Sequence, residues 1–65
     1  MKLTAEQKRW IMTADPDTGD LDPAPDWLTA ECRALGLVSW WPQMEVWRLT
    51  QAGWDEWEDL QWICS

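Results

Sequence analysis

The chain has 65 residues, with eight Trp, no His, and twelve acidic residues against five basic ones, for a net charge of −7. A chain this short forms a single domain, here 1–65, and it has no apolar run long enough to span a membrane. Its negative surface should repel nucleic acid and anionic membranes and attract basic protein surfaces. Because no apolar segment follows Lys2 as it would in a signal peptide, we expect a cytoplasmic protein.

Residues 4–14 are expected to form the first helix. Thr4 followed three residues later by Gln7 is typical of a capping box, in which each side chain bonds to the other residue's backbone N–H. Asp15-Pro16 should end the helix, because proline cannot continue the hydrogen-bond ladder. The apolar residues that share one side of this helix are Leu3, Trp10, Ile11 and Ala14.

Residues 15–26 are expected to form an acidic loop. This segment contains five Asp, three Pro and one Gly, which leaves almost nothing for a helix or a central strand. Leu21 is its single large apolar residue, and we expect it to hold the loop against the domain.

The second expected helix covers residues 27–35. It begins either with Asp26 as its cap or earlier, with Pro23 or Pro25 at its first position. Gly36 follows the helix where a left-handed residue can end it, so that Leu37 packs back on Cys32. The apolar stripe of the helix is Leu28, Cys32 and Leu35.

Residues 37–49 are expected to form a hairpin. Val38–Trp41 and Met44–Leu49 are rich in β-branched and aromatic residues, and Pro42-Gln43 makes the turn between them. Alternation places Trp47 and Leu49 on one face of the second strand, which we assign to the core.

A last helix is expected over residues 51–63, with Thr50 as its cap. The apolar face of this helix is Trp54, Trp57, Leu60 and Cys64. The complete pattern predicts an α+β fold with three helices and a two-stranded antiparallel hairpin, in the order α-α-β-β-α. We expect most of the eight Trp to fill the core, and one or two, Trp40 and Trp62, to be exposed and to anchor a partner.

The segment from about residue 28 to residue 54 resembles winged-helix domains of the MarR and PadR type. In those families a recognition helix ends in Leu-x-x-Leu-Gly-Leu-Val, a wing follows, and an aromatic-Arg-Leu-Thr-x-Ala-Gly segment begins the next helix. The matching residues here are Leu35-Gly36-Leu37-Val38 and Trp47-Arg48-Leu49-Thr50-Gln51-Ala52-Gly53. The resemblance implies a degenerate winged-helix fold. The acidic loop replaces the helix that precedes the recognition helix in those families, and this departure counts against DNA binding.

The sequence contains few residues that could carry out catalysis or bind a metal. There is no His, and the two Cys are too few for a structural zinc site, so we expect neither an enzyme nor a cofactor. The loop from Asp15 to Asp26 has the length of an EF-hand calcium loop. Its fifth and sixth positions are Gly19 and Asp20, the reverse of the EF-hand order, and its twelfth is Asp rather than Glu, so we predict no metal site.

The acidic residues support the most specific hypothesis. Carboxylates two apart in an extended loop, or three and four apart on a helix, have a spacing similar to that of nucleic-acid phosphates. The protein would then be a protein-binding inhibitor that blocks a basic nucleic-acid-binding surface, similar in general type to small acidic phage-encoded anti-CRISPR proteins. The residues predicted to form its acidic surface are Asp15, Asp17, Asp20, Asp22, Asp26, Asp55, Glu56, Glu58 and Asp59.

Two other hypotheses remain open at this stage. One is a winged-helix transcription regulator or accessory factor that uses the second helix and Arg48 on DNA. The other is a structural adaptor that binds through exposed Trp, with acidic residues that serve only for solvation. The sequence slightly favours a monomer and does not identify the partner.

Overall fold

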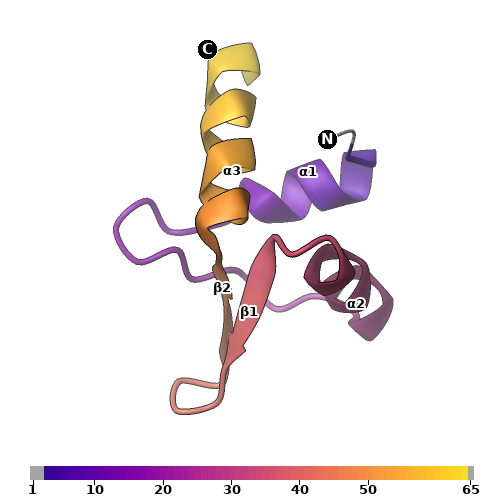
Figure 1. The fold of residues 1–65 in the computed structure, drawn as a ribbon, viewed down its shortest axis with the longest axis vertical. Helices are drawn as coiled ribbons and strands as arrows, with labels where there is room; N and C mark the ends of the chain where they lie inside the picture. Colours follow the sequence, from indigo (N-terminus) through magenta and orange to yellow (C-terminus); the bar gives the residue numbers. More distant parts are fainter. Residues whose placement is uncertain (1–2, 65) are drawn as a thin grey trace.

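A computed structural model of the chain describes the backbone of residues 3–64 and the side chains of residues 3–62. Its elements, shown in Figure 1, are α1 (Ala5–Ile11), α2 (Asp26–Ala34), β1 (Val38–Trp41), β2 (Val46–Leu49) and α3 (Gln51–Cys64). The α+β class and the order of elements predicted from the sequence are confirmed. Among the described residues, no helix is long and apolar enough to cross a membrane.

α1 begins as predicted and ends early. Gln7 N donates to Thr4 Oγ1 over 3.2 Å and Thr4 N donates to Gln7 Oε1 over 3.0 Å, so the capping box is present. The helix ends at Ile11 rather than at residue 14, because the N–H of Thr13 turns to the carbonyl of Trp10, three residues back. Gln7 is buried, which the sequence did not indicate, and its amide donates to Glu31 of α2 over 3.0 Å.

α2 has an N-terminus that differs from the prediction and a C-terminus that agrees with it. Asp26 is the first helical residue and Pro25 is the cap, so the Asp26 side chain does not cap the helix. At the other end Gly36 has φ +76°, and the N–H of Leu37 donates to the carbonyl of Cys32 over 3.0 Å. Leu37 and Cys32 are fully buried, as expected for this type of cap.

One member of the predicted α2 stripe is misplaced. Leu35 is 37% exposed, whereas Leu28 and Cys32 are buried. Leu35 is the C-cap residue, one position after the last helical residue, and the chain turns there toward Gly36. A stripe extrapolated with the helical period therefore fails at this position.

β1 and β2 form an antiparallel pair in which Val38 faces Leu49 and Trp40 faces Trp47. β2 begins at Val46 rather than at residue 44, because the turn covers residues 42–45 and Glu45 has φ +51°. Leu49 is buried and Trp47 is half-buried against the core, so the predicted core face of β2 is confirmed.

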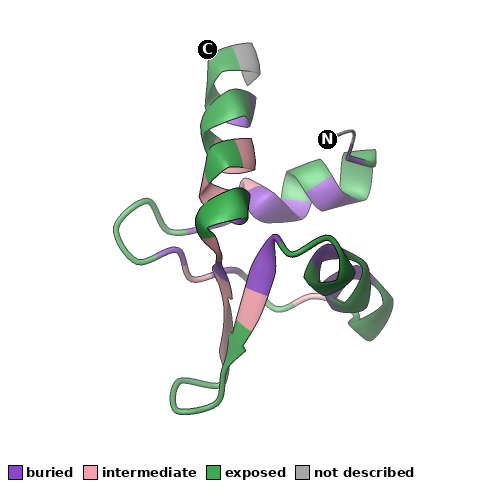
Figure 2. Cartoon of the chain, viewed as in Figure 1, coloured by how far each residue is buried: buried purple, intermediate pink, exposed green. Residues whose placement is uncertain are grey.

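α3 is fixed to the hairpin at its first turn. Gly53 N donates to Thr50 Oγ1 over 3.2 Å, which confirms the predicted cap. Leu60 is buried and Trp54 and Trp57 pack against the core, as predicted, whereas the side chain of Cys64 lies outside the described residues. Figure 2 shows buried residues where α1, α3 and the hairpin meet. The core residues are Leu3, Trp10, Ile11, Ala14, Leu21, Leu28, Cys32, Leu37, Val38, Leu49 and Leu60.

Residues 15–25 form a loop, as predicted, and this loop also bonds to β2 at an isolated bridge in which Asp20 faces Arg48. Leu21 N donates to the carbonyl of Trp47 over 2.9 Å, and Leu49 N donates to the carbonyl of Gly19 over 3.1 Å. Leu21 is buried, as expected. β2 therefore lies between β1 and the loop, and β1 is the outer strand.

Candidate partner-binding surfaces

The first half of the acidic loop is closed by its own hydrogen bonds. Asp15 N donates to the carbonyl of Asp20 over 2.9 Å, and Gly19 N donates to the carbonyl of Asp15 over 2.7 Å. The carboxylate of Asp15 accepts from Asp17 N over 2.8 Å. The loop thus presents the exposed side chains of Asp15 and Asp17 in a defined conformation.

α3 carries its exposed acidic residues beside this loop. Asp55, Glu58 and Asp59 are exposed, and spacings of three and four residues place them on one side of the helix. Gly19 lies so close to α3 that a Cβ added to it would be 2.9 Å from Cζ2 of Trp54. Figure 1 shows the loop beside the N-terminal end of α3. We call the surface formed by both segments the acidic face; its members are Asp15, Asp17, Asp55, Glu58 and Asp59.

Trp62 lies on the same side of α3 as these acids. It follows Glu58 by four residues and Asp59 by three, and its side chain is 82% exposed. A predicted apolar anchor therefore lies within reach of the acidic face. Glu56, which was also predicted to belong to the acidic surface, is half-buried on another side of the helix.

Three predicted acids lie elsewhere. Asp20 pairs with Arg48 over 2.5 Å, so its charge is neutralised within the fold. Asp22 lies where the chain crosses toward α2, and its carbonyl accepts from the indole Nε1 of Trp10 over 2.7 Å. Asp26 is at the start of α2, away from α3 (Figure 1). Sequence spacing alone could not separate these residues from the acidic face.

The Trp residues are more exposed than the sequence led us to expect. We predicted one or two exposed Trp. Trp10 is 4% exposed, and three others are half-buried. Trp41 is on the face of β1 that points away from the core, and it is exposed there. The guanidinium carbon of Arg48 lies over its ring, 4.9 Å from the ring centroid. The exposed Trp, with their exposed fractions, are Trp27 (55%), Trp40 (47%), Trp41 (41%) and Trp62 (82%).

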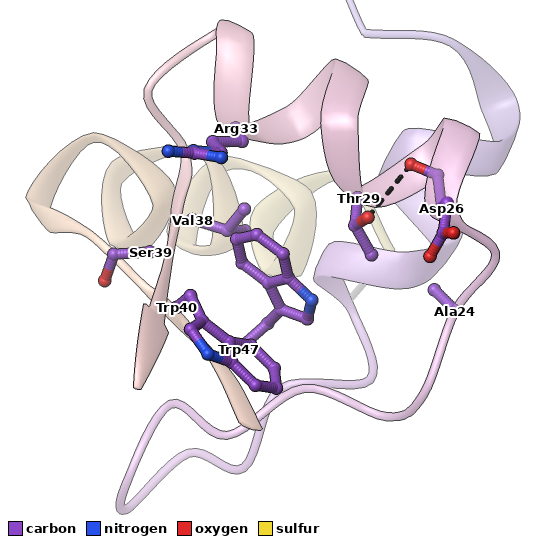
Figure 3. A pocket seen from close by; sticks show the side chains of 8 residues that line it. All are labelled: Ala24, Asp26, Thr29, Arg33, Val38, Ser39, Trp40 and Trp47. Carbon is purple, nitrogen blue, oxygen red and sulfur yellow. Dashed lines mark hydrogen bonds between the residues drawn. The ribbon is translucent and has the colours of Figure 1, made fainter. Parts of the chain in front are cut away.

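A groove between α2 and the hairpin was not predicted. Its volume is about 640 Å³, and Figure 3 shows its walls. On the hairpin side, the rings of Trp40 and Trp47 are 5.3 Å apart and inclined at 59°. On the α2 side, the sequence carried one signal of the groove: Asp26, Thr29 and Arg33 are three and four residues apart, so their side chains lie on one side of the helix. The lining residues are Ala24, Asp26, Thr29, Arg33, Val38, Ser39, Trp40 and Trp47.

The described residues include no arrangement for metal binding and no activated thiol. No group of three His, Cys, Asp or Glu within them is placed to hold a metal ion. Burial, together with a smaller effect of the Glu31 carboxylate, raises the pKa of the Cys32 thiol to about 11. Cys32 is therefore a protonated core residue at neutral pH.

Two surfaces thus offer binding chemistry, the acidic face and the groove. Comparisons of the chain with protein-family models, with curated proteins and with solved structures find no match. The function must be inferred from the chemistry of these two surfaces.

Proposed function

We propose that the protein is a small acidic inhibitor, encoded by a phage or another mobile element, that acts in the host cytoplasm. It would bind a basic nucleic-acid-binding surface of a host defence complex, such as a subunit of a CRISPR–Cas effector, in the manner of an anti-CRISPR protein. The observation that carries this proposal is the acidic face, because two neighbouring segments, the loop and α3, both carry exposed carboxylates.

The charges of the acidic face are available to a partner. Among the described residues, no basic side chain forms an ion pair with any of its five members. The Cβ atoms of acidic residues at these spacings on α3 are about 5–6 Å apart, and phosphates follow each other about every 3.4 Å along one strand of a nucleic acid. A groove of Lys and Arg that fits a nucleic-acid backbone can accept such a row of carboxylates.

The construction of the loop favours binding. Its backbone hydrogen bonds hold Asp15 and Asp17 in place before a partner arrives, which reduces the entropy lost on association. Trp62 adds a large apolar side chain that can be desolvated at the contact, as is common for residues that dominate interface energy.

In the winged-helix alternative, the surface that would contact DNA has few cations that are free to bind phosphates. α2 would be the recognition helix and the hairpin would be the wing, with Arg33 and Arg48 near the phosphates. Arg48 is engaged by Asp20 and by the ring of Trp41. DNA affinity grows with the number of phosphates that cations neutralise, so this surface supports duplex binding less well than the acidic face supports a basic partner.

The experiment is a pull-down of the tagged protein from host lysate at low salt, with elution by a salt gradient and identification by mass spectrometry. A nucleic-acid-handling complex that elutes as salt rises is the expected result. The test variant carries Asn at the acidic-face residues Asp15, Asp17, Asp55 and Asp59, and it should lose the complex.

A matched control separates the acidic face from net charge. It neutralises four exposed acids outside that face, Glu6, Asp22, Asp26 and Glu45, and changes the net charge by the same amount. The control should retain the complex. Equal loss of binding in both variants, or retention in both, would contradict the proposal.

A further inference from the structure

A second hollow adjoins the groove at the Trp40 and Trp47 rings. It has a volume of about 290 Å³ and lies between residues 21–24, which follow the bridge from the loop to β2, and the turn end of the hairpin. Ala24, Trp40 and Trp47 line both the hollow and the groove. Because its volume is at the lower end of the range for ligand-binding pockets, the hollow suits a single side chain.

The two indoles give the hollow a surface that attracts cations. Their ring centroids are 5.3 Å apart and the ring planes are inclined at 59°, so the rings meet at an angle (Figure 3). Trp40 is exposed and Trp47 is half-buried, which leaves part of both residues accessible. The face of an indole carries negative potential, and among aromatic rings it binds a cation most strongly.

Two carboxylates border the same hollow. Asp22 lies on the loop side and Glu45 lies at the turn of the hairpin, and both residues are exposed. Within the described part of the chain, no side chain bonds to either carboxylate. The described residues that line the hollow include no base, and Arg33 lines the groove instead. A cation at the indoles would therefore meet two negative charges that the described residues do not neutralise.

The backbone holds both acidic residues in place before a ligand arrives. Asp22 N donates to Thr13 Oγ1 over 3.3 Å, and the Asp22 carbonyl accepts from Trp10 Nε1 over 2.7 Å. Glu45 has φ +51°, a left-handed conformation that Gly and Asn adopt more readily than Glu. Residues held in such conformations are common at binding sites. Binding would thus require little further ordering of the backbone.

We propose that the hollow binds the guanidinium of an arginine side chain of a partner protein. The planar group stacks on an indole face of the Trp40 and Trp47 pair, and its N–H groups donate to the carboxylates of Asp22 and Glu45. Neither acid belongs to the acidic face. The hollow is therefore a separate site and does not depend on the function proposed for that face.

The chemistry of the hollow favours arginine over other cationic groups. A guanidinium is more weakly hydrated than the ammonium of lysine, so it loses less on contact with the indoles, and its planar shape matches both a ring and a carboxylate. A quaternary ammonium would retain the attraction to the rings, but it has no N–H to donate to Asp22 or Glu45. The net charge of −7 also favours the approach of a basic segment.

The test is an NMR titration of the full chain with blocked Gly-Xaa-Gly peptides, in which Xaa is arginine, lysine, trimethyllysine or citrulline. The indole Nε1–H signals of Trp40 and Trp47 report binding, and that of Trp27, which does not line the hollow, is the reference. The arginine peptide should shift the Trp40 and Trp47 signals and bind about threefold or more tightly than the lysine peptide. The neutral citrulline peptide should bind about tenfold or more weakly than the arginine peptide.

Two double variants with the same change of charge test the carboxylates. Asp22→Asn with Glu45→Gln should weaken binding of the arginine peptide by about tenfold or more, because it removes both charged acceptors. Glu58→Gln with Asp59→Asn makes the matched change on α3, away from the hollow, and should alter binding by less than about twofold.

Two single variants test the indole. Trp40→Leu should weaken binding of the arginine peptide by about fivefold or more, because it removes one of the two rings from the hollow. Trp27→Leu replaces another exposed Trp, which does not line the hollow, and should leave binding unchanged. Since both positions are exposed, the fold should tolerate either change.

Several results would overturn the proposal. One is the absence of any shift of the Trp40 and Trp47 indole signals at millimolar concentrations of the arginine peptide. Another is equal binding of the arginine and citrulline peptides, or equal weakening by the two double variants. Tighter binding of the trimethyllysine peptide would assign the hollow to a quaternary ammonium, and tighter binding of free arginine would assign it to a small molecule. None of these results bears on the acidic face.

Discussion

Arg48 and Asp20 join β2 to the acidic loop, with Nε of the guanidinium 2.5 Å from the carboxylate Oδ1. The same guanidinium lies 4.9 Å from the centroid of the Trp41 ring. One cation thus holds the loop, β2 and an exposed indole of β1 together. The pair also neutralises the charge of Asp20, and it engages Arg48, which would contact phosphates in the winged-helix alternative.

The first prediction concerns the energy of this pair. In a double-mutant cycle of Arg48→Met and Asp20→Asn, we expect a coupling energy of about 0.5–1 kcal/mol, because both side chains are partly exposed. The measurement is urea unfolding at low and high salt, and salt should reduce the coupling. The control cycle uses Arg33→Met and Asp26→Asn, which form no ion pair, and should give a coupling near zero. A coupling of zero for Arg48 and Asp20 would refute the structural role.

The second prediction contrasts two glycines. A Cβ added at Gly53 would overlap the carbonyl oxygen of Leu37, so Gly53→Ala should destabilise the protein by about 1–3 kcal/mol even though Ala favours helices. Gly36 has open space around it but φ +76°, so Gly36→Ala should cost about 1–2 kcal/mol.

Asn distinguishes the two causes, because it tolerates the left-handed conformation and is larger than Ala. Gly36→Asn should be less harmful than Gly36→Ala, and Gly53→Asn should be more harmful than Gly53→Ala. Urea unfolding midpoints measure all four variants, and the same ranking at both positions would disagree with this explanation.

The third prediction tests the link between α1 and the loop. The indole of Trp10 is buried and donates to the Asp22 carbonyl over 2.7 Å. Trp10→Phe removes this donor and part of the buried ring, and should lower the free energy of unfolding by about 2–4 kcal/mol. Trp27→Phe, at an exposed position, is the control and should change stability by less than about 0.5 kcal/mol. Similar losses in both variants would argue against the bond.

The fourth prediction is a stability change at alkaline pH. The pKa of Cys32 is raised from 9.0 to about 11 in the folded protein, so the unfolded thiol ionises first as pH rises. Its contribution to stability is complete below pH 9 and is lost between pH 9 and about 11. Urea unfolding across this range checks the prediction in a Cys64→Ser background, which leaves one thiol. The same slope in a Cys32→Ala variant of that background would assign the effect to other groups.

The fifth prediction follows from the proposed inhibitor function. Replacement of Asp15, Asp17, Asp55 and Asp59 by Asn should slow association with the captured partner more than it speeds dissociation, because these charges act before contact. Trp62→Ala should have the opposite profile and mainly raise the dissociation rate. Surface plasmon resonance at several salt concentrations measures both rates. An association rate that does not depend on salt would exclude an electrostatic role for the acidic face.

The parts of the fold that the sequence predicted depend on short-range geometry. The Thr4 and Gln7 capping box, the left-handed Gly36 and the Thr50 cap each satisfy backbone groups within a few residues, so the residue types alone specify them. Alternation and helical period similarly gave the buried faces of β2 and α3. The acidic residues of α3 and their neighbour Trp62 were identified for the same reason, since spacing on one helix fixes which side chains share a side.

The other features required contacts between distant segments. The loop bonds to β2 through residues far apart in the sequence, and this pairing neutralises Asp20 and places Gly19 against Trp54. The number of exposed Trp also depends on tertiary packing. Three helices and two strands enclose a small core, and this core buries only the indole rings that point into it. Local sequence therefore determined the elements and their polarity, whereas packing determined which acids and which indoles remain exposed.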